Sequence, residues 1–294
     1  MDIVLRGAAA ALGRLPGPIA WWCGRRLGDT LALVLPGRRR QALENLARAF
    51  PDLSPRQRRQ LCQRAYHHLG HTVMEICGLL ARPLERTLSA ITLDGREHLE
   101  AAMATTGRAL LLTAHVGNWE MLVAAHRLTA YRLAIVVRPL DSGLLDRLAR
   151  LWREKSGVEL IDKRGAAQPV RAALAAGGMV GILLDQNAAR REAVFVPFFG
   201  VAASTSRSIA VLAMRTRTPI LPVFIRREGR DRHRAVIHPP LPGSGSNGSS
   251  RAVVELTARC TAAIEAAIRE APEQWLWMHD RWRTRPAPGP RPIP

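Results

Sequence analysis

From residue 108 onward, apolar runs of strand length alternate with segments whose apolar side chains recur at helical spacing. Short apolar runs bounded by turn residues indicate buried strands, and apolar side chains three and four residues apart indicate helices with one buried face. The predicted strands are 108–114, 132–137, 158–161, 179–184, 193–196, 219–225 and 234–238, and the predicted helices are 119–130, 142–155, 167–176, 204–216 and 251–270. This alternation predicts an α/β fold in which a largely parallel central sheet carries helices on both faces.

Two helices are predicted ahead of the sheet. Within 38–50, apolar residues stand at i, i+3, i+4 and i+7, and Pro51 ends this helix. The sequence Ser54-Pro-Arg-Gln57 is a capping box with proline at the first helical position, which predicts a second helix over about 55–80. A short strand at 91–93 and a short helix at 97–103 complete the approach to the sheet.

The first 37 residues have a different character. Ile19–Trp22 and Leu31–Leu35 are apolar, but arginines and Gly/Pro residues keep every run well below the ~18–20 apolar residues of a membrane-spanning helix. Tryptophans beside arginines suit the headgroup region of a membrane, although an ordinary amphipathic core helix shows the same composition. We therefore expect a membrane-associating segment at 1–37, a main domain at 38–285 and a disordered proline-rich tail at 286–294.

Composition narrows the classes of partner. The 294 residues include 43 Lys and Arg against 24 Asp and Glu, a formal charge of +19, and 41 of the basic residues are arginine. Codon composition accounts for part of this bias, yet the charge favours nucleic acid, an anionic membrane, a phosphorylated substrate or an acidic carrier protein. The four cysteines are scattered, which argues against a zinc site or disulfide framework and suits a reducing compartment.

The strongest candidate for chemistry lies between the strand at 108–114 and the helix that follows it. His115 comes at the carboxyl end of that strand, where open α/β sheets place their ligand sites. Gly117 permits a tight turn and Asn118 can cap a helix, so Glu120 would lie in the first helical turn. This geometry predicts that Glu120 orients the His115 imidazole, while a structural histidine beside a helix-dipole partner remains the alternative.

Other known catalytic motifs are missing from the sequence. There is no G-x-S-x-G, no cysteine in a turn after a strand, no P-loop and no G-x-G-x-x-G. Without a nucleophile to carry a transferred group, the natural task for His115 is to take the proton of a substrate hydroxyl as that hydroxyl attacks.

Further polar residues collect at the ends of later strands and in the helices that follow them. Arg138, Arg153 and Arg164 could bind phosphate or carboxylate or stabilise an oxyanion, although any one of them could simply be solvated. Asp185-Gln186-Asn187 ends an apolar strand at the expected rim. Pro197-Phe-Phe-Gly200 followed by Ala203-Ser-Thr205 predicts a rigid aromatic turn that leads into a helix cap, with core packing as the simpler role of the phenylalanines.

These motifs stand in a specific order: His115-x4-Glu120, Arg138-Pro139, Asp185-Gln186, Pro197-Phe-Phe-Gly200 with Thr205, and Gln274-Trp-Leu-Trp-Met-His-Asp-Arg281-Trp-Arg, preceded by Asn45-Leu46 and Phe50-Pro51. In this order and spacing the sequence resembles the lipid A biosynthesis (lauroyl/myristoyl) acyltransferases, within the lysophospholipid acyltransferase superfamily whose hallmark is H-x4-D/E. The resemblance covers about residues 38–285, which makes this the expected acyltransferase domain. The N-terminus departs from the family, whose members usually carry a clearer hydrophobic anchor.

The resemblance implies an acyltransferase at the cytoplasmic face of the inner membrane. It would transfer a fatty acyl chain from an acyl-carrier-protein thioester, or from acyl-CoA, to a hydroxyl of a lipid A precursor, with no cofactor or metal. His115 would be the base and Glu120 its orienting partner. The residues expected to bind substrate are Asn118, Arg138, Arg153, Arg164, Asp185, Gln186 and Thr205.

Three alternatives stay open on the sequence. The acceptor could be another glycolipid, an ornithine lipid or a lysophospholipid, because the motifs place a hydroxyl and a thioester without specifying the molecule. A basic nucleic-acid-binding protein would explain the charge, but no binding motif is present, and Tyr and Phe number only 2 and 5. An inactive membrane scaffold is disfavoured by the intact His115 and Glu120. We therefore expect no nucleic-acid partner.

Overall fold

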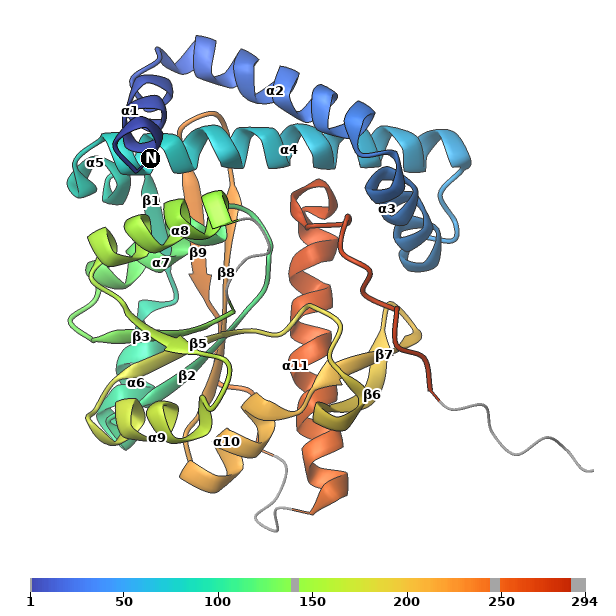
Figure 1. The fold of residues 1–294 in the computed structure, drawn as a ribbon. Coiled ribbons are helices and arrows are strands. Elements are labelled where there is room, and N and C mark those ends of the chain that lie inside the picture. The colour runs from blue at the N-terminus through green and yellow to red at the C-terminus, as the bar shows by residue number, and fades with distance from the viewer. Residues whose placement is uncertain (1, 139–142, 244–248, 287–294) are drawn as a thin grey trace, which may run out of the picture.

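A seven-stranded sheet forms the centre of the molecule in the computed structural model, which describes residues 2–138, 143–243 and 249–286 (Figure 1). Its strand order is β1-β9-β8-β2-β5-β3-β4, and only the β8–β9 pair is antiparallel. The strands are β1 Ile91–Asp94, β2 Ala109–Thr113, β3 Leu133–Val137, β4 Glu159–Asp162, β5 Met179–Leu183, β8 Ile220–Arg227 and β9 His233–Ile237. The predicted largely parallel sheet is confirmed.

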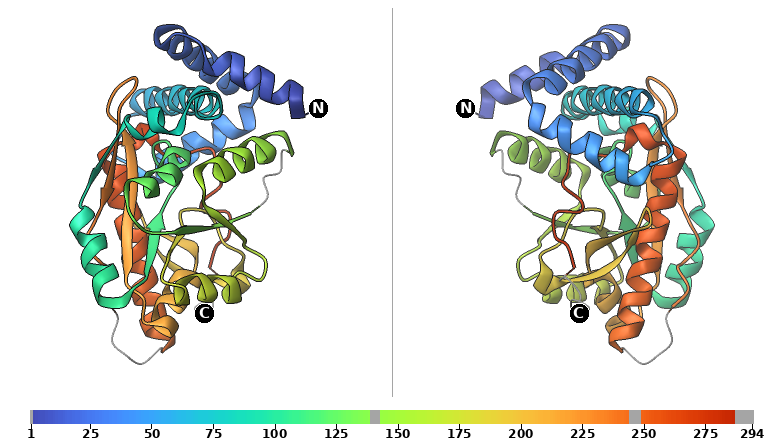
Figure 2. Two further views of the ribbon diagram at one scale, coloured as in Figure 1. Left: turned by 90° about the vertical axis from the view of Figure 1, so that its left-hand side faces the viewer. Right: turned by 90° about the vertical axis from the view of Figure 1, so that its right-hand side faces the viewer.

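Helices cover both faces of this sheet, as predicted (Figure 2). Successive strand residues point to opposite faces, so Leu110 and Leu112 of β2 join one buried cluster while Leu111 packs in another. On the Leu111 face lie α5 Leu84–Leu88, α6 Arg96–Thr106, α7 Trp119–Ala125 with the short helix η1 His126–Leu128, and α8 Gly143–Ser156. On the other face lie α9 Ala167–Ala175, α10 Ser208–Thr216 and α11 Ser250–Glu270.

The N-terminal helices pack on one long helix across the top of the view in Figure 1. The long helix is α4 Pro55–Ala81, and the helices that pack on it are α1 Asp2–Gly13, α2 Gly17–Val34 and α3 Pro36–Ala49. The predicted capping box is present, with Ser54 and Gln57 bonded reciprocally at the start of α4. α2 and α4 approach so closely that a Cβ on Gly70 would lie 2.0 Å from the Gly24 carbonyl oxygen. None of the helices in the described ranges is long and apolar enough to span a bilayer.

A second sheet was not predicted. β6 Ala193–Phe198 and β7 Val201–Ser206 form an antiparallel hairpin, whose two-residue turn Phe199-Gly200 has positive φ at both positions. That conformation matches the twist of a hairpin. The predicted aromatic turn is present, but the prediction that it leads directly into a helix at 204–216 was wrong. Residues 201–206 pair with β6, and α10 begins only at Ser208.

The remaining short helices are η2 Arg190–Glu192 and η3 Pro272–Gln274. The predicted proline-rich tail at 286–294 lies outside the described residues except for its first position, and so does residue 142 of the predicted helix 142–155.

Candidate active site

The turn from β2 to α7 holds His115 at the carboxyl edge of the sheet, as predicted. Gly117 has φ 61°, and a Cβ there would lie 2.0 Å from the Ile225 carbonyl oxygen, so no other residue fits without a backbone shift. The side chain of Asn118 caps α7 by accepting from the Met121 N–H at 3.3 Å. The Gly117 N–H donates to the Gln274 carbonyl at 2.9 Å, which attaches the turn to the C-terminal segment.

Asp185 is the carboxylate that holds His115. Its Oδ1 lies 2.9 Å from Nδ1 of the imidazole, and its Oδ2 accepts the His115 backbone N–H at 3.0 Å and the Trp275 indole N–H at 2.8 Å. Burial alone raises the pKa of Asp185, but the charge of His115 and these hydrogen bonds outweigh it and hold that pKa at about 2. Because an ionised carboxylate only accepts, Nδ1 carries the proton, and in the neutral imidazole Nε2 of His115 then has a lone pair that can take a proton.

The prediction that Glu120 orients His115 was wrong in its contact, although both residues lie in the turn and first helical turn as expected. Glu120 is 3% exposed and forms a bidentate pair with Arg153 of α8, at 2.6 and 3.1 Å. Trp152 Nε1 donates to the Glu120 carbonyl at 2.8 Å, which fixes α8 against α7. The side chain of Glu120 is therefore taken by a neighbouring helix, whose position no local spacing reveals.

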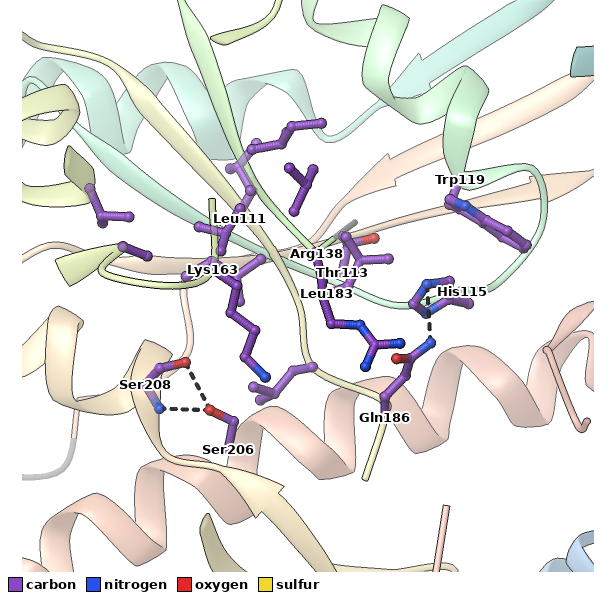
Figure 3. A pocket seen from close by; sticks show the side chains of 18 of the residues that line it. Leu111, Thr113, His115, Trp119, Arg138, Lys163, Leu183, Gln186, Ser206 and Ser208 are labelled. Carbon is purple, nitrogen blue, oxygen red and sulfur yellow. Dashed lines mark hydrogen bonds between the residues drawn. The ribbon is translucent and has the colours of Figure 1, made fainter. Parts of the chain in front are cut away.

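A cavity of about 830 Å³ opens beside His115 (Figure 3). The pairing of β3 with β5 ends at Ile135 and Gly181, while β5 continues beside β2 and β3 beside β4. The two strands therefore separate at their carboxyl ends, and the cavity enters this gap. It is lined from one face of the sheet by Ile135 and from the other by Val136.

The cavity changes character along its length. Its deep part runs between the sheet and α6–α7, where the lining is aliphatic and includes Leu111, Leu122, Leu133 and Met179. Around the whole cavity, nine Lys and Arg side chains stand against three Asp and Glu. Such a space suits a molecule that combines a hydrocarbon chain with an anionic group.

Of the other predicted site residues, Glu120, Arg138, Arg153 and Gln186 line the cavity with His115. Figure 3 shows the Gln186 amide beside the imidazole, and its Nε2 lies 3.5 Å from Nε2 of His115. A substrate hydroxyl that displaced this amide would meet the free lone pair of His115. Such an arrangement can remove a proton from a bound hydroxyl.

Four of the residues expected to bind substrate do not line the cavity. Asn118 is fully buried and donates to Glu75 Oε2 at 2.7 Å. Asp185 is 2% exposed and supports His115 from behind without lining the cavity. Thr205 is buried in β7, where it accepts from Arg281 at 2.6 Å. The side chain of Arg164 is exposed and does not line the cavity, although its neighbour Lys163 does.

Sequence reasoning missed the residues of α4 that support the turn from below. His68 Nε2 lies 3.1 Å from the Gly117 carbonyl oxygen, and Glu75 binds Arg227, His233 and the cap residue Asn118. Burial raises the pKa of Glu75, but the charge of Arg227 and the bonds from His233 and Asn118 lower it to about 2. The only signal for these contacts was the presence of polar side chains within the helix predicted over about 55–80.

These buried groups predict a loss of stability in acid. Burial and the charge of Arg227 lower the pKa of His68 to about 3, below the ~6.5 of an unfolded chain. Between these values the unfolded state binds more protons, so the His68 contribution is complete above about pH 6.5 and is lost as the pH falls toward 3. The melting temperature of His68→Gln should therefore fall less steeply than that of the wild type between pH 6.5 and 4. Parallel profiles, measured by circular dichroism, would contradict this.

Within the described residues, no three His, Cys, Asp or Glu side chains come together in a way that could hold a metal ion.

The sequence is similar to acyltransferases over almost its full length. A family model described as bacterial lipid A biosynthesis acyltransferase matches residues 3–284. The lipid A biosynthesis lauroyltransferase of Escherichia coli (strain K12) is 27% identical over 277 residues, 93% of this chain and 88% of that protein. The palmitoleoyltransferase of the same strain is 26% identical over 275 residues, with the same coverage of 93% and 88%. A phosphatidylinositol mannoside acyltransferase of Mycobacterium tuberculosis (strain ATCC 25618 / H37Rv) is 28% identical over 210 residues, 69% of this chain and 62% of that protein.

Proposed function

The chain belongs to the bacterial lipid A biosynthesis acyltransferase family, and we propose that it transfers a fatty acyl chain from an acyl-carrier-protein thioester to a hydroxyl of a lipid A precursor, with His115 as general base. The observation that supports the catalytic part is the His115–Asp185 pair beside a cavity that has an aliphatic region under α6 and α7 and many basic side chains around it. Base, acyl chain and anionic substrate group can thus meet at one place.

In the proposed step, the acceptor hydroxyl attacks the thioester carbonyl carbon while its proton passes to Nε2 of His115. A C–O bond forms, and the carbonyl π electrons move onto oxygen. When this tetrahedral species collapses, the C–S bond breaks and its electron pair leaves on sulfur. His115 then delivers the proton to the thiolate, so an ester and a free thiol result. Asp185 stays ionised throughout and stabilises the imidazolium that forms between the two proton transfers.

The charge and shape of the cavity support the proposed substrates. Nine cationic side chains against three carboxylates favour a phosphorylated acceptor and an acidic carrier protein over neutral substrates. Arg153 is already paired with Glu120, so its remaining donors are held in a fixed direction at the cavity wall. The aliphatic depth beneath α6 and α7 accommodates the hydrocarbon tail.

Gly181 offers a test of where the acyl chain lies. It lines the cavity from β5, and a Cβ at this position would already approach Ile135 Cγ2 to 3.3 Å. We expect the larger side chain of Gly181→Val to shorten the available space and shift the preferred donor to shorter chains. Each excluded methylene should lower the relative kcat/KM about fourfold, since burying one CH₂ contributes about 0.8 kcal/mol. Competition among thioesters of graded length, read by mass spectrometry, measures the ratio independently of the folded fraction. An unchanged preference would place the chain elsewhere.

We propose further that the protein acts at the cytoplasmic face of the inner membrane and contacts it through α2. Six of the eight large apolar side chains exposed in the described residues lie between Leu12 and Leu35. Ile19, Trp22 and Leu33 fall along one stripe of α2, and Arg26 lies on the same stripe. An apolar stripe with cationic residues is typical of helices that lie in the membrane interface.

This proposal predicts that Trp22→Ser combined with Leu33→Ser weakens binding to vesicles containing anionic phospholipid by at least about tenfold, given the free energy of burying large apolar side chains. Trp22 and Leu33 are 61% and 78% exposed, so neither change should disturb folding. Val254→Ser on α11 is the matched control, since it removes an exposed apolar side chain elsewhere on the molecule. Cosedimentation that is equal for the two variants would contradict the assignment.

The proposed reaction is tested with purified protein, a phosphorylated lipid A precursor, and acyl carrier protein or CoA charged with the same chain. The expected result is a mass increase of one acyl group on the lipid, with the carrier-protein thioester preferred. Transfer only to a different glycolipid, such as phosphatidylinositol mannoside, would correct the acceptor while keeping the chemistry. A folded protein that acylates none of these lipids would overturn the proposal.

A further inference from the structure

A second histidine, His279, lines the same cavity as His115. It belongs to the irregular C-terminal segment, whose backbone is fixed from α3. Asn45, which is fully buried, donates to the Trp277 carbonyl at 2.8 Å and to the His279 carbonyl at 2.7 Å. The position of the His279 imidazole is therefore set by a fixed backbone. The proposed transfer step does not use this imidazole.

The hydrogen bonds of His279 define its tautomer. Nε2 accepts the backbone N–H of Asn187 at 3.0 Å, so this nitrogen carries no proton. A neutral imidazole must then carry its proton on Nδ1. Burial is the main cause that lowers the pKa of His279 to about 4, so the ring stays neutral near pH 7. Among the described residues nothing accepts from Nδ1, and this atom is not sealed from solvent.

One tripeptide thus organises two imidazoles in opposite ways. Asp185 accepts from Nδ1 of His115 and leaves a lone pair on its Nε2, whereas the Asn187 N–H occupies Nε2 of His279 and leaves an N–H donor on its Nδ1. Gln186, between them, lies in the cavity beside His115. A base and a neutral donor held by the same loop match the two needs of acyl transfer, which are to remove a proton and to stabilise a carbonyl oxygen as it becomes negative.

We propose that Nδ1–H of His279 donates a hydrogen bond to the carbonyl oxygen of the acyl thioester and stabilises the oxyanion formed when the hydroxyl attacks. This inference rests on the proposed acyl transfer and names the side chain that stabilises the negative charge on the carbonyl oxygen during that transfer. No proton is transferred by His279. Its N–H is a preorganised donor, and such a donor acts on the transition state more strongly than on the bound substrate.

Two substitutions separate this task from a purely structural one. His279→Gln can keep an acceptor for the Asn187 N–H but has no donor at the Nδ1 position, whereas His279→Asn places an amide donor near that position and loses the acceptor. If His279 serves the oxyanion, His279→Gln should lower kcat about 10²-fold, as loss of one oxyanion donor does. KM for donor and acceptor should stay within about twofold, and His279→Asn should retain clearly more kcat than His279→Gln.

The measurement is steady-state acyl transfer per folded molecule, with folding checked by circular dichroism and thermal melting. Wild-type-like kcat in His279→Gln would overturn the proposal, and so would equal losses in the two variants or a change confined to KM. If His279→Asn does not fold, the kcat and KM of His279→Gln alone decide. Wild-type protein in the same assay separates this outcome from failure of the proposed function, since the wild type must transfer an acyl chain for either variant to be interpreted.

Discussion

Replacing His115 with alanine is expected to lower kcat for acyl transfer by about 10²–10⁴-fold, the usual contribution of a general base. The hydroxyl of a lipid acceptor is a poor nucleophile until its proton is removed. Nε2 of His115 has a lone pair that can accept this proton at the cavity. The imidazole is itself partly exposed in the cavity, so its loss should leave the fold and the affinity for the acyl donor close to those of the wild type. Turnover and KM are measured with purified protein and a carrier-protein thioester.

His98→Ala is the matched control for this experiment. His98 lies on α6, its side chain is 3.9 Å from that of Glu97 and it does not line the cavity, so its removal deletes an imidazole outside the site. Turnover by His115→Ala at the level of His98→Ala would exclude His115 as the base. Salt-sensitive DNA binding that His115→Ala leaves unchanged, without acyl transfer by the wild type, would instead favour the nucleic-acid alternative raised by the charge of +19.

Asp185→Asn should lower kcat by about 10³–10⁴-fold, an effect comparable to that of His115→Ala, because the amide favours the wrong tautomer of His115. Three donors converge on the Asp185 carboxylate: the ring and backbone N–H groups of His115 and the indole N–H of Trp275. An amide has one acceptor oxygen and an NH₂ group, so it cannot accept from both sides. When that NH₂ faces Nδ1, the imidazole proton moves to Nε2 and the base is lost.

Since Asp185 does not line the cavity, KM for both substrates should change little in this variant. Asp162→Asn provides the control, because Asp162 ends β4 at the same edge of the sheet, is exposed, and does not contact His115. The discriminating measurement is the kcat of folded protein. Full activity in Asp185→Asn would show that the observed pair does not serve the reaction, whereas equal losses in the two variants would indicate a general effect of charge.

The alternation of apolar runs was enough to predict the fold class, because strands buried on both faces leave continuous apolar segments whatever their neighbours are. It was also enough to place His115 at a strand end and Gly117-Asn118 in the turn, since these depend on local conformation. The hairpin β6–β7 was not predicted as a pair of strands. Its two strands lie on either side of Phe199-Gly200, and the sequence after this turn predicts a helix cap.

The sequence by itself determined the α/β architecture, the histidine at the edge of the sheet and the excess of cations, all of which follow from short-range periodicity and composition. Only the tertiary structure decided which carboxylate meets that histidine. Asp185 lies 70 residues away, just after the end of β5, the strand that pairs with β2, whereas Glu120 is five residues away but faces Arg153 on another helix. Hydrogen bonds are satisfied across paired strands and packed helices, so the partners of a buried charge depend on strand order, which no local spacing encodes.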